Sequence, residues 1–324
     1  MMKAAIIRAA GDKPIYGDFA EPVATEGTEI ISVTASALSN FSKARSSGSH
    51  YSSDAVFPAV AGADGIGVTA EGRRVYFVLP VAPYGALAEK ALVRSKLTVS
   101  VPDELDDVTA AAIANPGMSA WAALVERAVL KPGETVLIHG ATGSAGRVAV
   151  QIAKHLGAWK VIATGRNEAE LEELKAIGAD VIVPFNLGPL HPAGEKQYEE
   201  AIKAAIADGV NVVLDYLWGK SARTVMAAIV KTIEDATPVR FVHVGAASGE
   251  DSIDLPGAAL RSSSIQLMGS GLKSVPLEKL LAAIANVFAI TKTANLQVAT
   301  RTLPLSSIEE AWNAPGKPRV VVRI

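Results

Sequence analysis

The chain contains no cysteine among its 324 residues. Disulfides, thiolate metal sites and cysteine nucleophiles are therefore excluded. Aromatic residues make up only 5% of the chain, and no aromatic cage or stacking platform is evident. A chain without disulfides fits a reducing compartment, so we expect a cytoplasmic protein.

An excess of charge and long apolar runs are also missing. The formal net charge is −2 and the sequence pI is about 6.2, so no global basic field favours nucleic acid or anionic lipid as a partner. The richest apolar window, Thr109–Val125, is interrupted by Asn115-Pro116-Gly117 and is not expected to cross a membrane. The N-terminus lacks the apolar core and cleavage site of a signal peptide.

Apolar residues are nevertheless plentiful. They make up 49% of the chain, enough for a sizeable core, and the length predicts about two domains. The first hundred residues favour strands punctuated by glycine and proline, and Ser36–Ser53 is interpreted as a loop or short helix. The strands predicted here are Lys3–Arg8, Glu29–Ala35, Arg73–Leu79, Ala86–Val93 and Lys96–Val99.

Strands and helices alternate after a helical segment, Asp106–Leu130, that we expect to break at Asn115-Pro116-Gly117. Short βα units with continuously apolar strands predict a parallel sheet buried on both faces. The predicted strands are Glu134–Gly140, Lys160–Thr164, Val181–Pro184, Val210–Tyr216, Val239–Gly245, Ser264–Met268 and a last one at Arg319–Ile324. The predicted helices are Ser144–Leu156, Glu168–Ile177, Tyr198–Ala207, Lys220–Ile233 and Leu277–Ala289, with Asn186–Gln197 as a surface loop.

A glycine-rich turn follows the first strand of this series. Gly140, Gly143 and Gly146 have the spacing G-x-x-G-x-x-G between a strand and a helix. Small residues let the backbone approach a pyrophosphate, and the helix N-terminus offers free N–H groups to it. The sequence therefore predicts a dinucleotide site. Its contacts at the turn are Gly140, Thr142, Gly143, Ser144, Ala145 and Gly146.

The end of the second strand of the series distinguishes between the two nicotinamide cofactors. A carboxylate there would bind the ribose hydroxyls of NAD, whereas this chain has Thr164-Gly165-Arg166-Asn167. An arginine can hold a 2′-phosphate bidentately. We therefore expect NADP(H), with Thr164, Gly165, Arg166 and Asn167 as contacts. The alternative is that Arg166 is an ordinary solvated side chain.

Several blocks together resemble the medium-chain dehydrogenase/reductase superfamily, and most closely its zinc-independent, zeta-crystallin-like quinone oxidoreductase branch. The resemblance covers almost the whole length. The blocks are Ala35–Asn40, Pro58–Gly67, Gly85–Glu89, Asn115–Trp121 and Lys131–His139 leading into the glycine turn.

The resemblance implies an α/β fold in which a Rossmann doubly wound parallel sheet is inserted into a β-rich, twisted-barrel (GroES-like) catalytic domain. The expected boundaries are 1–118 and 267–324 for the catalytic domain and 119–266 for the NADP(H)-binding domain. It also implies a homodimer or homotetramer, often formed by pairing of the sixth strand, Ser264–Met268. Further cofactor contacts that it implies are Met118, Ser119, Asp215, Gly245, Ala246, Met268 and Gly269.

This chain differs from the zinc alcohol dehydrogenases of the superfamily at the positions that would bind zinc. Ser39 stands where a cysteine ligand is expected, and Gly62-Ala63-Asp64 replaces Gly-His-Glu. The cysteine-rich structural zinc lobe is missing, and the five histidines have no metal-ligand spacing. We expect no metal, and we expect His139 to be structural.

The expected reaction is hydride transfer from NADPH to a small quinone or an α,β-unsaturated carbonyl without zinc. Neutral donors would stabilise the negative charge that builds on the carbonyl oxygen. The resemblance and the loop position favour Ser39, Asn40 and Tyr51, although hydrogen bonding within the loop is an equally good interpretation of each.

Two other hypotheses stay open. One is a zinc-free carbonyl or enoyl-thioester reductase with another acceptor. The other is a non-catalytic NADPH-binding protein, such as a redox sensor, a crystallin-like structural protein or an RNA binder, the last disfavoured by the acidic pI.

Overall fold

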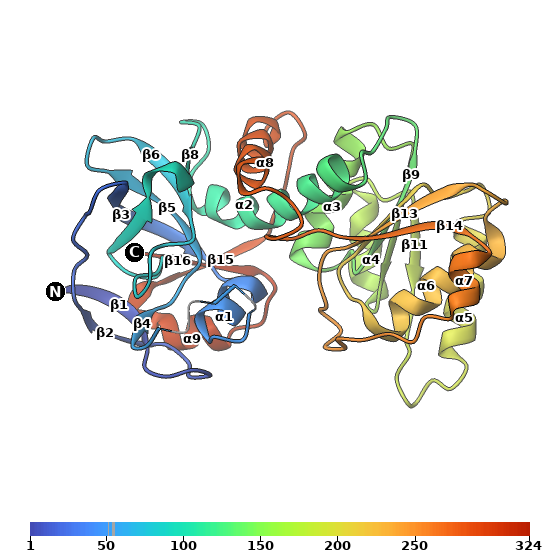
Figure 1. Ribbon diagram of the computed structural model, residues 1–324, viewed down its shortest axis with the longest axis horizontal. Helices are drawn as coiled ribbons and strands as arrows, with labels where there is room; N and C mark the ends of the chain where they lie inside the picture. The colour runs from blue at the N-terminus through green and yellow to red at the C-terminus, as the bar shows by residue number, and fades with distance from the viewer. Residues whose placement is uncertain (51, 54–55) are drawn as a thin grey trace. The chain divides into compact units, whose positions relative to one another are not determined.

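The computed structural model describes residues 1–50, 52–53 and 56–324. The chain divides into two compact units (Figure 1). The β-rich unit consists of residues 1–115, 284–289 and 297–324, and the nucleotide-binding unit of residues 116–283 and 290–296. The chain passes from the β-rich unit to the nucleotide-binding unit after Asn115, close to the predicted boundary at 118. The chain leaves the nucleotide-binding unit only after Ala283, well beyond the predicted residue 267.

The nucleotide-binding unit is built on one six-stranded sheet in which all neighbouring strands are parallel. The strand order β11-β10-β9-β12-β13-β14 is that of a doubly wound Rossmann sheet, so the predicted fold class is confirmed. The order reverses between β9 and β12. The strands are β9 (Thr135–His139), β10 (Lys160–Gly165), β11 (Val181–Pro184), β12 (Val212–Asp215), β13 (Pro238–His243) and β14 (Ser264–Gly269).

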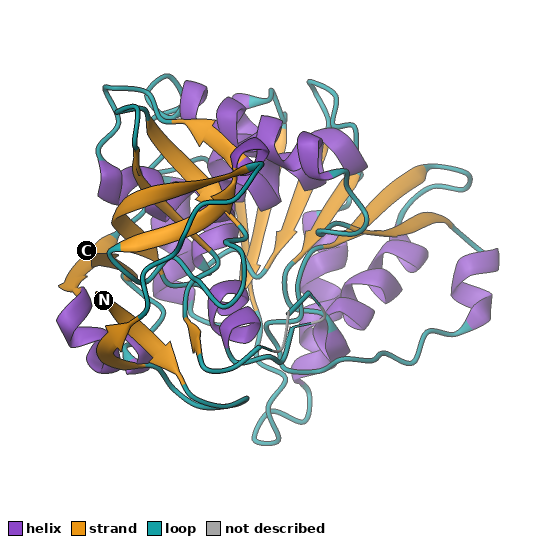
Figure 2. Cartoon of the chain, turned by 60° about the vertical axis from the view of Figure 1, so that its left-hand side comes forward, coloured by secondary structure: helices purple, strands orange, loops and turns teal. Residues whose placement is uncertain are grey.

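Helices cover both faces of this sheet (Figure 2). On one face, the strand residues Leu137 and Val213 share an apolar core with Ile202 of α5 and Val225 of α6. On the other face, α3 contacts β9 and β10, and α4 contacts β10 and β11. These helices are α3 (Ser144–His155), α4 (Glu168–Lys175), α5 (Gly194–Ala205), α6 (Gly219–Thr232) and the short α7 (Gly257–Arg261).

The β-rich unit contains a seven-stranded and a three-stranded sheet. The larger has the order β15-β16-β3-β5-β6-β8, with β7 also paired to β3, and the smaller has the order β2-β1-β4. Only β15 and β16 are parallel among the described pairs. The strands are β1 (Met2–Ile7), β2 (Ile15–Phe19), β3 (Thr28–Ala37), β4 (Ala59–Val60), β5 (Asp64–Thr69), β6 (Arg74–Val78), β7 (Lys90–Arg94), β8 (Thr98–Ser100), β15 (Thr300–Pro304) and β16 (Arg319–Arg323), and the helices are α1 (Asn40–Ser46) and α9 (Ile308–Asn313).

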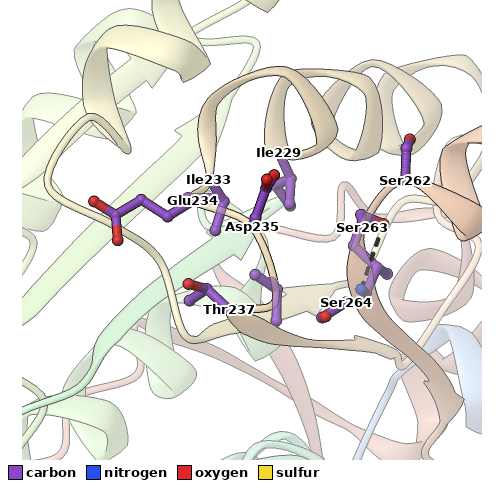
Figure 3. Close-up of a pocket in the computed structure, with 10 residues that line it drawn as sticks. Ile229, Ile233, Glu234, Asp235, Thr237, Ser262, Ser263 and Ser264 are labelled. Carbon is purple, nitrogen blue, oxygen red and sulfur yellow. Dashed lines mark hydrogen bonds between the residues drawn. The ribbon is translucent and has the colours of Figure 1, made fainter.

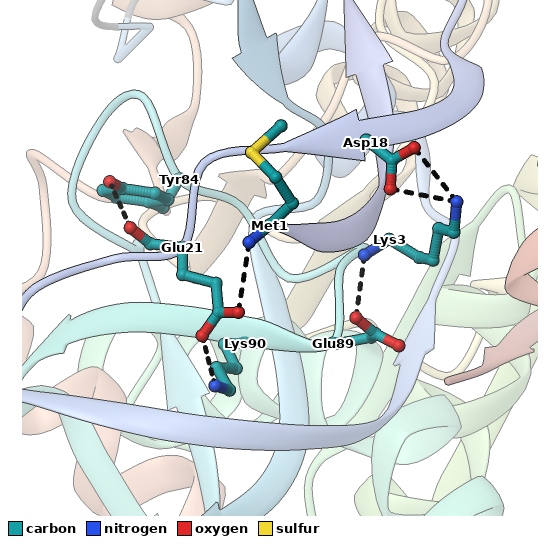
Figure 4. Close-up of polar contacts among 7 residues, drawn as sticks. All are labelled: Met1, Lys3, Asp18, Glu21, Tyr84, Glu89 and Lys90. Atoms are coloured by element: carbon teal, nitrogen blue, oxygen red, sulfur yellow. Dashed lines mark hydrogen bonds and ion pairs between the residues drawn. The ribbon is translucent and has the colours of Figure 1, made fainter.

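Ion pairs lie within the smaller sheet and beside it (Figure 4). The carboxylate of Glu21 forms ion pairs with the N-terminal amino group of Met1, at 3.3 Å, and with Lys90. Lys3 on β1 pairs with Asp18 on β2 at 2.9 Å. Each of these side chains is at least 40% exposed, so the pairs add little to stability.

Two expectations about the first 130 residues were wrong. Gly65 and Gly67 are two of the glycines expected to separate the predicted strands, but both lie inside β5, which pairs with β3 and β6. A Cβ on Gly67 would lie 2.4 Å from the Ser32 carbonyl oxygen, so the close approach of β3 requires glycine there. The predicted break at Asn115-Pro116-Gly117 is also absent, because α2 (Asp107–Trp121) continues through Pro116.

The apolar segment around α2 lies largely inside the protein. Residues 107–127 form one helical stretch, α2 followed by a π-helical turn at Ala122–Arg127, with a mean hydropathy of 1.3. By length and composition alone it could span a membrane, yet 61% of the 18-residue segment that has this hydropathy is buried inside the protein. Burial within the fold accounts for its apolar character. Both α2 and α8 (Leu277–Ile290) contribute residues to each of the two units.

Candidate dinucleotide site

The glycine-rich turn lies at the carboxyl end of β9, where the strand order reverses. Gly140 has φ +87°, and the N–H groups of Gly140 and Ala141 both donate to the Thr164 carbonyl, at 3.1 and 2.9 Å. A Cβ on Gly146 would lie 2.5 Å from the Gly140 carbonyl oxygen. Backbone geometry therefore requires glycine at the first and third positions of the motif.

The N-terminus of α3 has no side-chain cap. Its N-cap residue is Gly143, and a Cβ there would meet only the Gly140 carbonyl oxygen, at 3.5 Å. Thr142, Ser144 and Ala145 are half-buried at the same end. An uncapped twelve-residue helix offers first-turn N–H groups and the positive end of its dipole, which fits a pyrophosphate.

The four candidates at the end of β10 have different roles. Thr164 is fully buried, and a Cβ on Gly165 would lie 2.8 Å from Thr142 Cγ2. Asn167 caps α4, because its Oδ1 accepts the Glu170 N–H at 3.2 Å. Arg166 is exposed and, within the part of the chain that the structure describes, forms no hydrogen bond or ion pair. Arg166 is thus the candidate whose charged group is available to a ligand.

A row of polar side chains crosses four neighbouring strands directly beneath the turn. Thr164 pairs with His139, His139 with Asp215 and Asp215 with His243 in the strand register. Their contacts are Thr164 Oγ1 to His139 Nδ1 at 2.7 Å and His243 Nδ1 to Asp215 Oδ2 at 3.1 Å. These groups hold the carboxyl edge of the sheet in place.

His139 is a structural residue, as predicted. Its Nε2 contacts the Ser221 hydroxyl at 2.8 Å, and Tyr198 OH lies 3.0 Å from its Nδ1. Burial lowers the pKa of His139 to about 4, with the charge of Asp215 opposing the shift. The imidazole is therefore neutral at physiological pH, with both nitrogens engaged by the protein.

Asp215, a predicted cofactor contact, is also engaged by the protein. It is fully buried, and its Oδ1 accepts the N–H groups of Leu217 and Trp218, both at 3.0 Å. Its Oδ2 contacts His243. The carboxylate shapes the turn that leads into α6.

The other cofactor candidates of this unit lie on several elements. Met118 packs beside Ala122 and Val275, and Ser119 donates to the Pro116 carbonyl at 3.0 Å. After β13, the Gly245 N–H donates to the Asp215 carbonyl at 3.3 Å, and Ala246 is exposed. Met268 and Gly269 end β14 and pair with the last two residues of β13. Tyr216, the residue after Asp215 and β12, has a buried hydroxyl without a hydrogen-bond partner.

The catalytic candidates belong to the β-rich unit. Ser39 is the N-cap of α1, where its Oγ accepts the Ser42 N–H at 2.9 Å and keeps its own proton to donate. Asn40 begins α1 and is exposed. Tyr51 lies outside the described residues. The structure therefore places Ser39 and Asn40 side by side, with a capping function for Ser39.

Asp64, in the block that replaces Gly-His-Glu, lies in a buried polar cluster. Tyr76 OH donates to its Oδ2 at 2.7 Å, and the buried guanidinium of Arg319 attracts it. Burial raises the pKa of Asp64 to about 6, against the opposing effects of Tyr76 and Arg319. Residues 1–50, 52–53 and 56–324 contain no group of three or more His, Cys, Asp or Glu that could hold a metal. The donor set here does not fit catalytic zinc.

A shallow pocket lies at the opposite end of the Rossmann sheet (Figure 3). It lies where β13 and β14 begin, whereas the candidate site lies where the strands end. It is lined by Ile229, Ile233, Glu234, Asp235, Thr237, Val239, Ser262, Ser263, Ser264 and Ile265.

The strand order, the glycine turn and the uncapped helix define a Rossmann dinucleotide-binding unit. Similarity to known proteins is consistent with this. The family described as zinc-binding dehydrogenase matches residues 145–286. The "Probable NADPH-dependent quinone reductase tdiC" of Emericella nidulans is 28% identical over 266 residues, 72% of each chain.

Two further proteins are similar. "Prostaglandin reductase 1" of Rattus norvegicus is 35% identical over 132 residues, but the match spans only 38% of that protein and 40% of this chain. The solved quinone oxidoreductase of Thermus thermophilus, whose structure was also determined in complex with NADPH, has a TM-score of 0.79 and 27% identity over the full length of both chains. These similarities are what the resemblance to the medium-chain dehydrogenase/reductase superfamily and its quinone oxidoreductase branch predicts.

Proposed function

We propose that this protein is an NADPH-dependent reductase that transfers a hydride to a quinone or an α,β-unsaturated carbonyl compound without zinc. The observation that carries the proposal is the exposed, unpaired Arg166 directly after β10, the strand paired with β9, whose glycine turn leads into the uncapped N-terminus of α3. A cation at this strand end suits a 2′-phosphate, where a carboxylate would repel it. The names of the Emericella quinone reductase and of the Thermus enzyme's NADPH complex support the same cofactor.

The turn residues Thr142, Gly143, Ser144 and Ala145 would hold the pyrophosphate, and Arg166 would hold the 2′-phosphate. NADPH supplies a hydride when bound. In the β-rich unit, Ser39 and Asn40 would donate hydrogen bonds to the carbonyl oxygen on which negative charge builds. Ser39 is suited to this because accepting the Ser42 N–H leaves its own proton available.

We also propose that two chains pair through β14. This strand is at the edge of the sheet, and Leu267 on it is 42% exposed. An exposed edge strand presents unpaired N–H and C=O groups to a second copy. A homodimer or homotetramer in the cytoplasm is the expected state.

The experiment is NADPH consumption by the purified protein in EDTA, with ortho- and para-quinones, enones and aldehydes as acceptors and NADH in parallel. We expect turnover of quinones or enones with NADPH preferred. Turnover that requires added zinc would contradict the zinc-free chemistry. Tight NADPH binding without oxidation by any acceptor would favour a non-catalytic NADPH-binding protein.

A further inference from the structure

Tyr216 is the first residue after β12, next to the point where the strand order reverses. Its N–H donates to the His139 carbonyl at 3.0 Å. A Cβ built on Gly140 would lie 3.4 Å from Tyr216 Cβ. Tyr216 therefore forms part of the floor beneath the glycine-rich turn.

The hydroxyl of Tyr216 is buried without a hydrogen-bond partner. The residue is 8% exposed, and its oxygen is closed to solvent. Burial raises its pKa well above the ordinary value, with the neighbouring Ser119 hydroxyl opposing the shift, so the phenol keeps its proton. Ser119 itself donates to the Pro116 carbonyl, and no hydrogen bond of normal geometry joins it to the Tyr216 hydroxyl.

Among the residues that the structure describes, the buried tyrosines Tyr76 and Tyr198 have satisfied hydroxyls. Tyr76 OH donates to Asp64, and Tyr198 OH contacts His139 and Thr164. An unpaired buried hydroxyl is unfavourable, and phenylalanine would fill the same space without that cost. The unpaired hydroxyl of Tyr216 is therefore a group that a bound molecule could satisfy.

The position of Tyr216 indicates which part of a dinucleotide it faces. A doubly wound sheet binds one mononucleotide half on each side of the reversal in strand order. Arg166 follows β10, on the side that takes the adenosine half. Tyr216 follows β12, on the side that takes the other half.

We propose that the Tyr216 hydroxyl, with Ser119 beside it, hydrogen-bonds the nicotinamide half of bound NADPH. The carboxamide and the ribose hydroxyls of that half both offer an acceptor to a phenol. This inference rests on the proposed function, since it takes NADPH as the ligand.

The test uses Tyr216→Phe in the full-length protein, which removes one oxygen and leaves the packing intact. Fluorescence titration gives Kd for NADPH and for 2′,5′-ADP, which carries only the adenosine half. We expect Kd for NADPH to rise about tenfold, the loss of one hydrogen bond, and Kd for 2′,5′-ADP to stay unchanged. The Tm without ligand should stay the same or rise.

Tyr198→Phe is the matched control, because its hydroxyl is already used by the protein. It should lower the Tm and leave the ratio of the two Kd values as in the unmodified protein. Unchanged NADPH affinity in Tyr216→Phe overturns the inference, and so does an equal loss for NADPH and 2′,5′-ADP. If the unmodified protein binds 2′,5′-ADP and NADPH but Tyr216→Phe behaves identically, only this inference fails. If it binds neither, the proposed function fails as well.

Discussion

Each of the two units buries a cluster of polar side chains, and the two clusters differ in how completely they are paired. In the nucleotide-binding unit, the neutral side chains of His139, Thr164, Tyr198 and Ser221 each have a partner in the cluster. The buried Asp215 carboxylate beside them is also fully paired, with two backbone N–H groups and His243. In the β-rich unit, Asp64 and Arg319 are ionisable, and Asp64 Oδ1 and Arg319 Nε and Nη2 have no partner.

The cluster around His139 has a structural role, whereas the cluster of Asp64 and Arg319 depends on charge. Neutral groups that satisfy one another can be buried at little cost and respond weakly to pH. A buried carboxylate and guanidinium with unpaired atoms are costly, and each depends on the other's charge. The β-rich unit should therefore be the one whose stability responds to charge substitutions and to pH.

The largest effect is expected from Arg319→Leu, which leaves the Asp64 carboxylate without its compensating cation. The free energy of unfolding should fall by about 3–5 kcal/mol at pH 8. The loss should be smaller at pH 5, where Asp64 is mostly protonated. Urea unfolding at both pH values measures it.

Arg323→Leu is the matched control for this substitution. Arg323 is exposed at the end of the same strand, β16, so its removal should change the free energy of unfolding by no more than about 0.5 kcal/mol. A loss in Arg319→Leu that is the same at pH 5 and pH 8 would show that the two charges are not coupled.

The second effect is the pH dependence contributed by Asp64. Its pKa in the folded protein, about 6, lies above the ordinary value of 3.8, so the protonated form is favoured by folding. The stabilisation is present below about pH 4 and is lost as the pH rises through 6, a change of about 2–3 kcal/mol. Asp64→Asn should abolish this component of the pH dependence.

The measurement is urea unfolding of both proteins at pH 4.5 and 7.5, compared as differences so that other titrating groups cancel. Asp18→Asn serves as control, because Asp18 is 56% exposed and its loss should leave the pH dependence unchanged. If unmodified protein and Asp64→Asn lose stability in parallel between these pH values, Asp64 is not the responsible group.

The smallest effect is expected in the neutral cluster. Tyr198→Phe removes one hydroxyl, but His139 Nδ1 and Thr164 Oγ1 still contact each other at 2.7 Å. No buried group is left unpaired, so the cost should be about 1 kcal/mol and equal at pH 5 and pH 8. A larger loss at one of these pH values in urea unfolding would place a charge in this cluster.

The comparison also explains which parts of the molecule the sequence could predict. The nucleotide-binding unit follows from local patterns, since β11 occupies the predicted Val181–Pro184 and the glycine turn lies between β9 and α3 as expected. In the β-rich unit, β5 was missed because its glycines are required by the neighbouring strand β3, which is remote in sequence.

The same limit applies to individual side chains. Thr164 and Asn167 were predicted as cofactor contacts from their position at a strand end, and Asp215 from the family resemblance. Each side chain bonds a partner that only the fold identifies, and Arg166 is the charged group that stays available. The unpaired hydroxyl of Tyr216 and the electrostatic attraction between Asp64 and Arg319 depend on packing that no spacing rule encodes.

Titration of the protein and of Arg166→Ala with NADPH and NADH in EDTA measures whether Arg166 makes this Rossmann unit specific for NADPH. We expect the unmodified protein to bind NADPH at least about tenfold more tightly than NADH, and Arg166→Ala to lose this preference by weakening NADPH binding alone. Equal affinity for the two cofactors, or an equal loss for both in Arg166→Ala, would contradict this expectation.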